Sequence, residues 1–161
     1  MPAYNKEWLK KIEEQEAQIR FERFDTDMAL KIGLAAVEEA RKQGGGYAVQ
    51  LIYRDAVCFQ HLMEGTTAYH EWWMRKKLNA CRKLGVSTLR AFCELKEGKL
   101  EKQPWMDDEG NYALNGGCVP LKYTSGEIFG YLLISGGHHE QDHQIGINAL
   151  AVILNKQVPF L

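Results

Sequence analysis

The sequence predicts an α+β fold in which helices flank an antiparallel sheet, with residues 1–161 forming one domain. Three observations indicate this class. The length suits one domain of ordinary size. Helical and β-rich segments follow one another along the chain. The β-rich segments come in pairs joined by short turns, which is typical of hairpins. With 45% hydrophobic and 25% charged residues, the chain has a globular composition.

Two expected helices open the chain. Residues 1–22 hold an N-terminal helix whose apolar positions, at helical spacing within 5–22, form only a thin stripe. The second helix begins at the cap candidates Asp25 and Thr26 and ends before the glycines at 44–46. A helix with so thin a stripe could lie across the domain or dock on another subunit. We expect a homo-oligomer, because the stripe and the apolar tail at 158–161 would otherwise leave hydrophobic surface in water.

The first hairpin is expected after the glycines. Residues 47–53 and 56–63 are β-rich, and only Arg54 and Asp55 separate them. The alternation places His61 on the same face as Phe59, which favours a packed or edge histidine over a ligand.

Two helices and a second hairpin follow. A helix is expected from 68 to 85, and Ser87 caps a shorter one that ends before Gly98. Residues 98–115 are polar and read as a solvated loop. Strands at 118–123 and 128–135 form the second hairpin, and a last helix runs from about His139 to Leu154.

Charge and apolar run length exclude several classes. Twenty Lys and Arg against 21 Asp and Glu leave a net charge of −1, so no global field attracts nucleic acid. The N-terminal residues are charged where a secretory signal would be apolar, and no apolar run approaches the ~20 residues that span a bilayer. The four cysteines lack metal-site spacing and read as free thiols. We expect a cytoplasmic protein that binds neither nucleic acid nor membrane.

The first candidate ligand surface is a basic helix. Arg75, Lys76 and Lys77 follow Trp72 and Trp73, and positive charge beside aromatic rings suits a flat anionic ligand. The alternative is a solvated helix face whose tryptophan rings fill the core.

The second candidate is the junction between the last strand and the last helix, where Gly136 and Gly137 leave room for close approach to the backbone. Glu140 and Asp142 in the first helical turn would repel an anion, so a cation or a hydrogen-bonding ligand suits this junction better. His139 and His143 lie four residues apart, a spacing compatible with two ligands to one metal. The alternative is that these histidines cap or pack the helix. No nucleophile-elbow, phosphate-loop or zinc-protease motif occurs.

The stretch 112–143 resembles the C-terminal half of the HbpS/GlcG-like family, often labelled haem-binding or haem-degrading. The matching positions are Gly116, Gly117, Pro120, Gly130, Ser135, Gly136 and Asp142. Upstream, residues 73–88 resemble a signature of an uncharacterised branch of that family, and the resemblance extends over residues 21–154.

The resemblance implies an α+β sandwich of helices on an antiparallel sheet of about five strands, and assembly as a homo-oligomer. It also implies haem as the candidate cofactor, with haem degradation the only reaction it suggests. We therefore expect a small-ligand-binding protein that need not be an enzyme. The alternative is a non-enzymatic homo-oligomeric assembly or adaptor protein. The candidate ligand-binding residues are Trp73, Arg75, Lys76, Lys77, Gly116, Gly117, Ser135, Gly136, Asp142 and His143.

If haem binds, its propionates would meet Arg75, Lys76 or Lys77, since carboxylates favour charge-assisted donors. Its iron would take one histidine among His61, His139 and His143, with His143 the first choice because it follows the family-matching Asp142.

Overall fold

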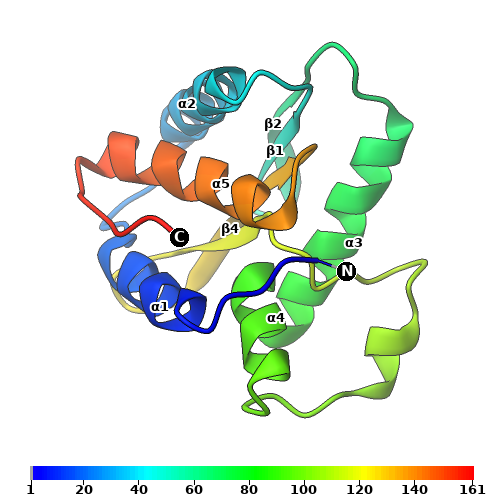
Figure 1. The fold of residues 1–161 in the computed structure, drawn as a ribbon. Coiled ribbons are helices and arrows are strands. Elements are labelled where there is room, and N and C mark those ends of the chain that lie inside the picture. Colours follow the sequence, from blue (N-terminus) through cyan, green and yellow to red (C-terminus); the bar gives the residue numbers. More distant parts are fainter. Residues whose placement is uncertain (1) are drawn as a thin grey trace.

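The computed structural model describes residues 2–161, so Met1 of the predicted segment 1–22 lies outside it. Its helices and strands follow the expected order (Figure 1). They are α1 (Trp8–Gln18), α2 (Thr26–Lys42), β1 (Ala48–Tyr53), β2 (Ala56–Leu62), α3 (Ala68–Leu84), α4 (Thr88–Lys96), a short 3-10 helix (Pro104–Asp107), β3 (Cys118–Lys122), β4 (Ile128–Ser135) and α5 (His139–Leu154). No helix in the described part of the chain has the length and hydrophobicity needed to cross a membrane.

The sheet within residues 2–161 has four antiparallel strands in the order β2-β1-β4-β3, which corrects the expectation of about five. The chain before α2 adds only an isolated bridge, Phe21 with Tyr123. Phe21 donates its amide to the Lys122 carbonyl and accepts from the Thr124 amide, and the chain then turns away to start α2. A single bridging residue makes no strand.

The two hairpins confirm the predicted pairing, and β1 also pairs with β4 at the centre of the sheet. The β1–β2 turn consists of Arg54 and Asp55, with φ values of 54° and 60°. Positive φ at both turn residues matches the twist of the strands in a two-residue hairpin.

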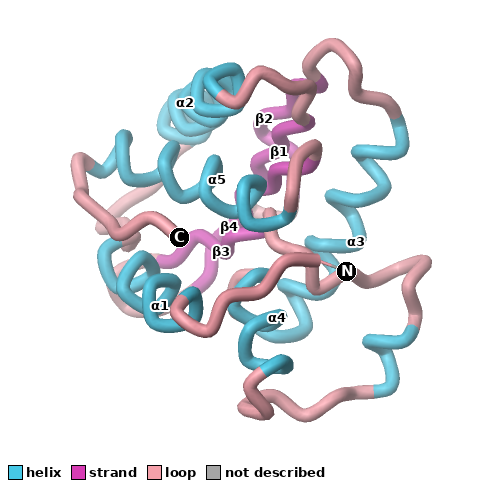
Figure 2. Tube along the Cα trace, in the orientation of Figure 1, coloured by secondary structure: helices cyan, strands magenta, loops and turns pink. Residues whose placement is uncertain are grey.

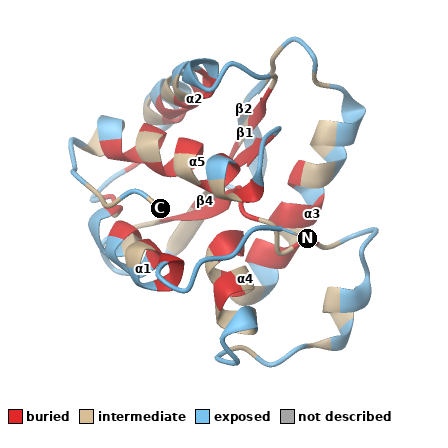
Figure 3. Ribbon diagram, viewed as in Figure 1, coloured by how far each residue is buried: buried red, intermediate tan, exposed pale blue. Residues whose placement is uncertain are grey.

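The sheet separates two layers of helices (Figure 2). On one face α2 and α5 cover Val49, Leu51, Leu132 and Ile134, which form the main core. On the other face α3 covers a smaller core, with Met74 and Leu78 packed near Ile52 and Leu133. Figure 3 shows this burial concentrated where the helices meet the strands.

The N-terminal helix is packed inside its own chain, contrary to the reasoning that its thin apolar stripe needs another subunit. Trp8, Leu9 and Ile12 are buried against Leu89 and Cys93 of α4. The tail behaves similarly, since Leu161 packs against this cluster and Val158 against the main core, while Phe160 is exposed.

Side-chain caps define three of the helix starts, as the sequence predicts for α2 and α4. Asp25 accepts a hydrogen bond from the Met28 amide, and Ser87 accepts one from the Arg90 amide. At α3, Thr67 accepts from the Tyr69 amide while the His70 side chain accepts from the Thr67 amide. This capping box orients His70.

Candidate functional site

A pocket of about 250 Å³ lies where the first turns of α3 face the junction between β4 and α5. Its lining residues are Tyr69, His70, Trp73, Lys77, Asn115, Ser135, Gly136, Gly137, His139 and Asp142. The pocket therefore lies between the two candidate surfaces of the sequence analysis, the basic helix and the strand–helix junction. A larger hollow of about 730 Å³, between the C-terminal ends of α2 and α5, holds none of the predicted site residues.

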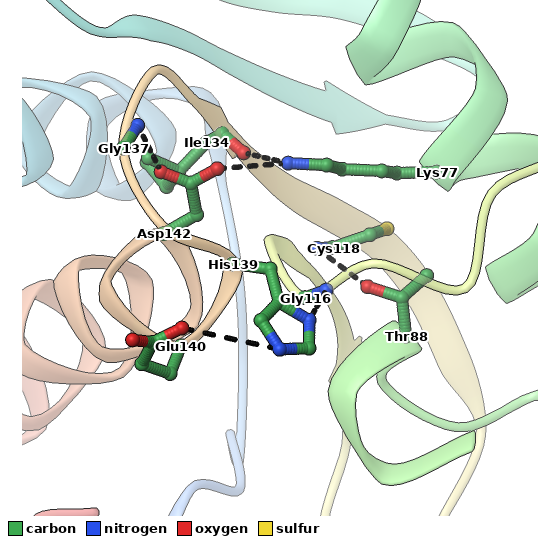
Figure 4. Close-up of polar contacts among 9 residues, drawn as sticks. All are labelled: Lys77, Thr88, Gly116, Cys118, Ile134, Gly137, His139, Glu140 and Asp142. Carbon is green, nitrogen blue, oxygen red and sulfur yellow. Dashed lines mark hydrogen bonds and ion pairs between the residues drawn. The ribbon is translucent and has the colours of Figure 1, made fainter. Parts of the chain in front are cut away.

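The floor of the pocket is a buried ion pair between Lys77 and Asp142 (Figure 4). Lys77 Nζ donates to Asp142 Oδ2 and to the Ile134 carbonyl, each at 3.0 Å, and the Gly137 amide donates to Asp142 Oδ1 at 2.9 Å. Each side chain is only 3% exposed. Burial raises the pKa of Asp142, and the Lys77 charge opposes this shift. An ammonium has three N–H donors, so one donor of Lys77 has no partner in this pair.

The family-pattern glycines make room for this ion pair. Gly117 has a φ of 132°, and a Cβ there would lie 2.7 Å from Lys77 Nζ. A Cβ at Gly136 would lie 2.9 Å from the Tyr47 Cα. Gly136 lines the pocket, whereas Gly116 and Gly117 lie buried behind it. Close packing of neighbouring atoms explains why these positions hold glycine.

His139 lines the pocket with both ring nitrogens engaged. Its Nδ1 accepts from the Gly116 amide at 3.2 Å, so its neutral form carries the proton on Nε2. Nε2 then donates to the Ala3 carbonyl at 2.7 Å. Burial lowers the pKa of His139, which keeps the ring neutral. Neither nitrogen is available to a metal ion in this arrangement.

His143 is fully buried, so the expectation that this part of the last helix faces solvent or a cleft is wrong. Helix α1 covers it, and its Nε2 lies 2.9 Å from Gln15 Oε1. Burial lowers the pKa of His143 to about 3. Its Nδ1 has no hydrogen-bond partner in the described chain.

The His139–His143 pair thus does not converge on one point. Within residues 2–161, no group of three or more His, Cys, Asp or Glu side chains is arranged to hold a metal ion. His61 lies exposed on the edge strand β2, away from the pocket.

The three adjacent basic residues of α3 point to different surroundings. Lys77 enters the pocket floor. Lys76 is buried, with Nζ 3.9 Å from the ring centroids of both Trp72 and Trp73, and burial lowers its pKa. Arg75 is exposed and does not line the pocket. The solvated-face alternative therefore describes Arg75, but neither lysine.

Three pocket residues were absent from the sequence prediction, namely Tyr69, His70 and Asn115. His70 accepts a hydrogen bond at Nδ1 from the Thr67 amide at 3.1 Å, so its neutral form has a proton on Nε2. Tyr69 is 58% exposed, and its ring lies 5.8 Å from Trp72 and 6.3 Å from Trp73. A capping motif at 67–70 is visible in the sequence, but its place beside Asp142 is not.

Three polar groups that line the pocket have hydrogen-bond donors without a partner. Ser135 is buried and its hydroxyl makes no hydrogen bond among residues 2–161, and the same holds for the half-buried Asn115 side chain. Together with the third donor of Lys77, they face a space bordered by Tyr69 and Trp73. This arrangement suits a ligand with an apolar or flat body and an oxygen-bearing arm.

Comparison with known proteins agrees with the fold and spans nearly the whole chain. A family model described as haem degrading protein HbpS-like matches residues 24–151. A UPF0303 protein of Brucella melitensis is 29% identical over 148 residues, covering 91% of this chain and 88% of that protein. A UPF0303 protein of Rhizobium etli is 29% identical over 154 residues, covering 95% of this chain and 93% of that protein.

Three solved structures share the fold. The crystal structure of the Ybr137w protein has a TM-score of 0.79 at 19% identity and covers 98% of this chain and 100% of its own. HbpS has a TM-score of 0.65 at 19% identity, and the match covers 81% of this chain and 89% of HbpS. A structure titled PduOC:Heme Complex has a TM-score of 0.68 at 21% identity, with coverages of 85% and 97%. At these identities, the likeness establishes the fold alone.

Proposed function

Because the chain belongs to the HbpS-like family, we propose that it binds a small ligand in the pocket between α3 and the start of α5, with haem as the first candidate. The observation that carries this proposal is the pocket itself. It combines aromatic side chains on one wall with donors of unused capacity on its floor. A structural neighbour whose title names a haem complex supports the choice of haem. No catalytic step is part of the proposal.

The size of the pocket decides how a haem would lie. Its 250 Å³ is below the ~300–1,000 Å³ usual for pockets that enclose drug-sized ligands, so it would hold one arm of the macrocycle. The rest of the ring would lie over the exposed Tyr69 and the neighbouring Trp73, since aromatic faces stack on flat ligands. Of the residues predicted from the sequence, the proposed site keeps Trp73, Lys77, Ser135, Gly136 and Asp142.

The residue that fits an iron ligand best is His70. The three histidines that the sequence favours present no free nitrogen to the pocket, whereas His70 lines it and leaves Nε2 unused. Binding iron through Nε2 would move the ring proton to Nδ1 and break the hydrogen bond from the Thr67 amide. That cap is worth about 0.5–2 kcal/mol, which is a modest cost beside an iron–imidazole bond.

A haemin titration followed at the Soret band tests the proposal with two variants. His70→Gln removes the imidazole but retains an acceptor for the Thr67 amide, because Gln is a preferred capping-box partner. His61→Gln is the matched control on the far edge strand. We expect saturable binding by the wild type and the control, and at least tenfold weaker binding by His70→Gln. Weak, non-saturating spectra from all three proteins would discard haem, while saturable binding untouched by His70→Gln would discard only this ligand residue.

Self-association is a second candidate function, and a different observation favours it. Leu30 and Leu34 on α2 are 50% and 53% exposed. Phe59 of the neighbouring edge strand β2 adjoins this part of the helix, because its ring occupies the space beside Gly33. We define Leu30, Leu34 and Phe59 as the α2–β2 patch. An apolar patch beside an open sheet edge is typical of a surface that another copy covers.

A further inference from the structure

We propose that the group recognised by the floor of the pocket is a carboxylate, held by Lys77, Ser135 and Asn115. The proposal deepens the proposed function and rests on it only in the use of the same pocket. The carboxylate can come from two sources, a propionate arm of haem or a free small carboxylic acid.

The pocket floor offers hydrogen-bond donors that a carboxylate can accept from. Lys77 can only donate, and one of its three N–H groups is unused. Ser135 is buried with an unpartnered hydroxyl that lines the pocket, and Asn115 offers an unpartnered amide. An ionised carboxylate is acceptor-only with about four lone-pair sites, so it matches this set.

The acidic residues of the junction, which in the sequence favour a cation or a hydrogen-bonding ligand, leave room for an anion in the fold. Asp142 has both oxygens engaged, Oδ2 by Lys77 and Oδ1 by the Gly137 amide, and Lys77 balances its charge. Glu140 does not line the pocket, and Figure 4 shows it directed toward His139 and away from Lys77. Neither carboxylate therefore opposes an anion as the sequence suggested. The first turn of α5, whose backbone dipole favours negative charge, borders the same space.

The small volume of the pocket also fits a carboxylate-bearing arm. A pocket of about 250 Å³ admits a carboxylate on a short chain, and it is too small to enclose a macrocycle. The ligand arm would thus be buried while its body stays outside, and the recognition would depend on the arm.

The test uses the whole wild-type chain and the Ser135→Ala variant, with Ser125→Ala in the β3–β4 turn as the matched control. Ser135→Ala removes no hydrogen bond made in the structure, so the variant should fold, and thermal unfolding verifies this. Two-dimensional amide NMR spectra are recorded during titration with propionate, and separately with propionamide, its uncharged analogue. Haemin and haemin dimethyl ester, which lacks free carboxylates, are compared at the Soret band.

We expect propionate to shift the Gly136 and Gly137 amide signals saturably, and propionamide to bind at least tenfold more weakly. Ser135→Ala should weaken propionate binding by about tenfold or more, the usual effect of losing a hydrogen bond to a charged group. Ser125→Ala should leave it unchanged. Saturable haemin binding with tenfold weaker binding of the ester would identify haem as the source of the carboxylate. Propionate binding without haemin binding would support the carboxylate site and discard haem.

Equal binding of propionate and propionamide, or no shift of these amides by propionate, would overturn the carboxylate proposal. Equal binding of haemin and its dimethyl ester would overturn it for haem while leaving haem binding intact. The two failures are therefore distinguishable, and the wild-type titrations decide the matter even if Ser135→Ala is unstable.

Discussion

Replacing Asp142 by Asn would leave the buried Lys77 ammonium without a counter-charge while keeping the size of the side chain. Both side chains are 3% exposed and 3.0 Å apart, so solvent cannot compensate for the loss. Removing one partner of a buried ion pair costs about 3–5 kcal/mol. Lys77 would still donate to the Ile134 carbonyl, and Asn could still accept from the Gly137 amide. We therefore expect the lower end, about 3 kcal/mol of the unfolding free energy.

Urea denaturation of Asp142→Asn, Lys77→Met and the double variant measures this effect. The double variant should lose less than the sum of the single losses, with a coupling energy of about 2 kcal/mol, because it leaves no unpaired charge. Asp55→Asn is the matched control. Asp55 Oδ1 lies 3.4 Å from Arg82 Nη2, and the side chains of Arg82 and Asp55 are 40% and 90% exposed, so the same substitution should cost less than about 1 kcal/mol of the unfolding free energy. Additive losses, or equal losses for Asp142→Asn and Asp55→Asn, would refute the reasoning.

Three further predictions concern the rest of the chain. The unfolding free energy should fall by up to about 1.4 kcal/mol per pH unit as the pH drops from 6.5 toward 3. Burial lowers the pKa of His143 to about 3, so over this range only the unfolded chain takes up the proton. Urea denaturation should show a weaker dependence of the unfolding free energy on pH for His143→Gln, and an unchanged dependence would contradict the assignment. Gly117→Ala should lower the free energy of unfolding by about 2 kcal/mol or more, and the melting temperature with it, because φ is 132° and the new Cβ would press on Lys77. An unchanged melting temperature in calorimetry would count against this packing. In light scattering, Leu34→Glu should reduce self-association while Val152→Glu, exposed on α5, should not, and a purely monomeric wild type at micromolar concentration would end the self-association candidate.

Elements of the fold could be predicted from the sequence where local chemistry specifies them. Asp25 and Ser87 cap helices as their residue types suggest, and Arg54 with Asp55 makes the expected two-residue turn. The two hairpins read from the sequence account for all four strands within residues 2–161, whereas the count of about five came from the family resemblance, and near Phe21 only an isolated bridge to Tyr123 forms. Such long-range pairing leaves no periodicity in the sequence.

The candidate site could be predicted only in part, because neighbours in sequence diverge in space. Lys76 and Lys77 look alike in the sequence, yet a rotation of about 100° along the helix places one on tryptophan rings and the other against Asp142. His143 was expected near a cleft, but α1 folds over it and Gln15 occupies its Nε2. Both outcomes depend on partners more than 60 residues away in the chain.

The central claim is that the pocket between α3 and α5 is where this protein binds its ligand, and blocking the pocket tests it most directly. Asn115 lies half-buried on the pocket lining and makes no side-chain hydrogen bond among residues 2–161, so Asn115→Trp should fill the space without disturbing the core. Equilibrium titrations of haemin and of propionate compare this variant with the wild type. We expect at least tenfold weaker binding of every ligand that the wild type binds saturably. Saturable binding of equal affinity in both proteins would place the ligand elsewhere and contradict the claim.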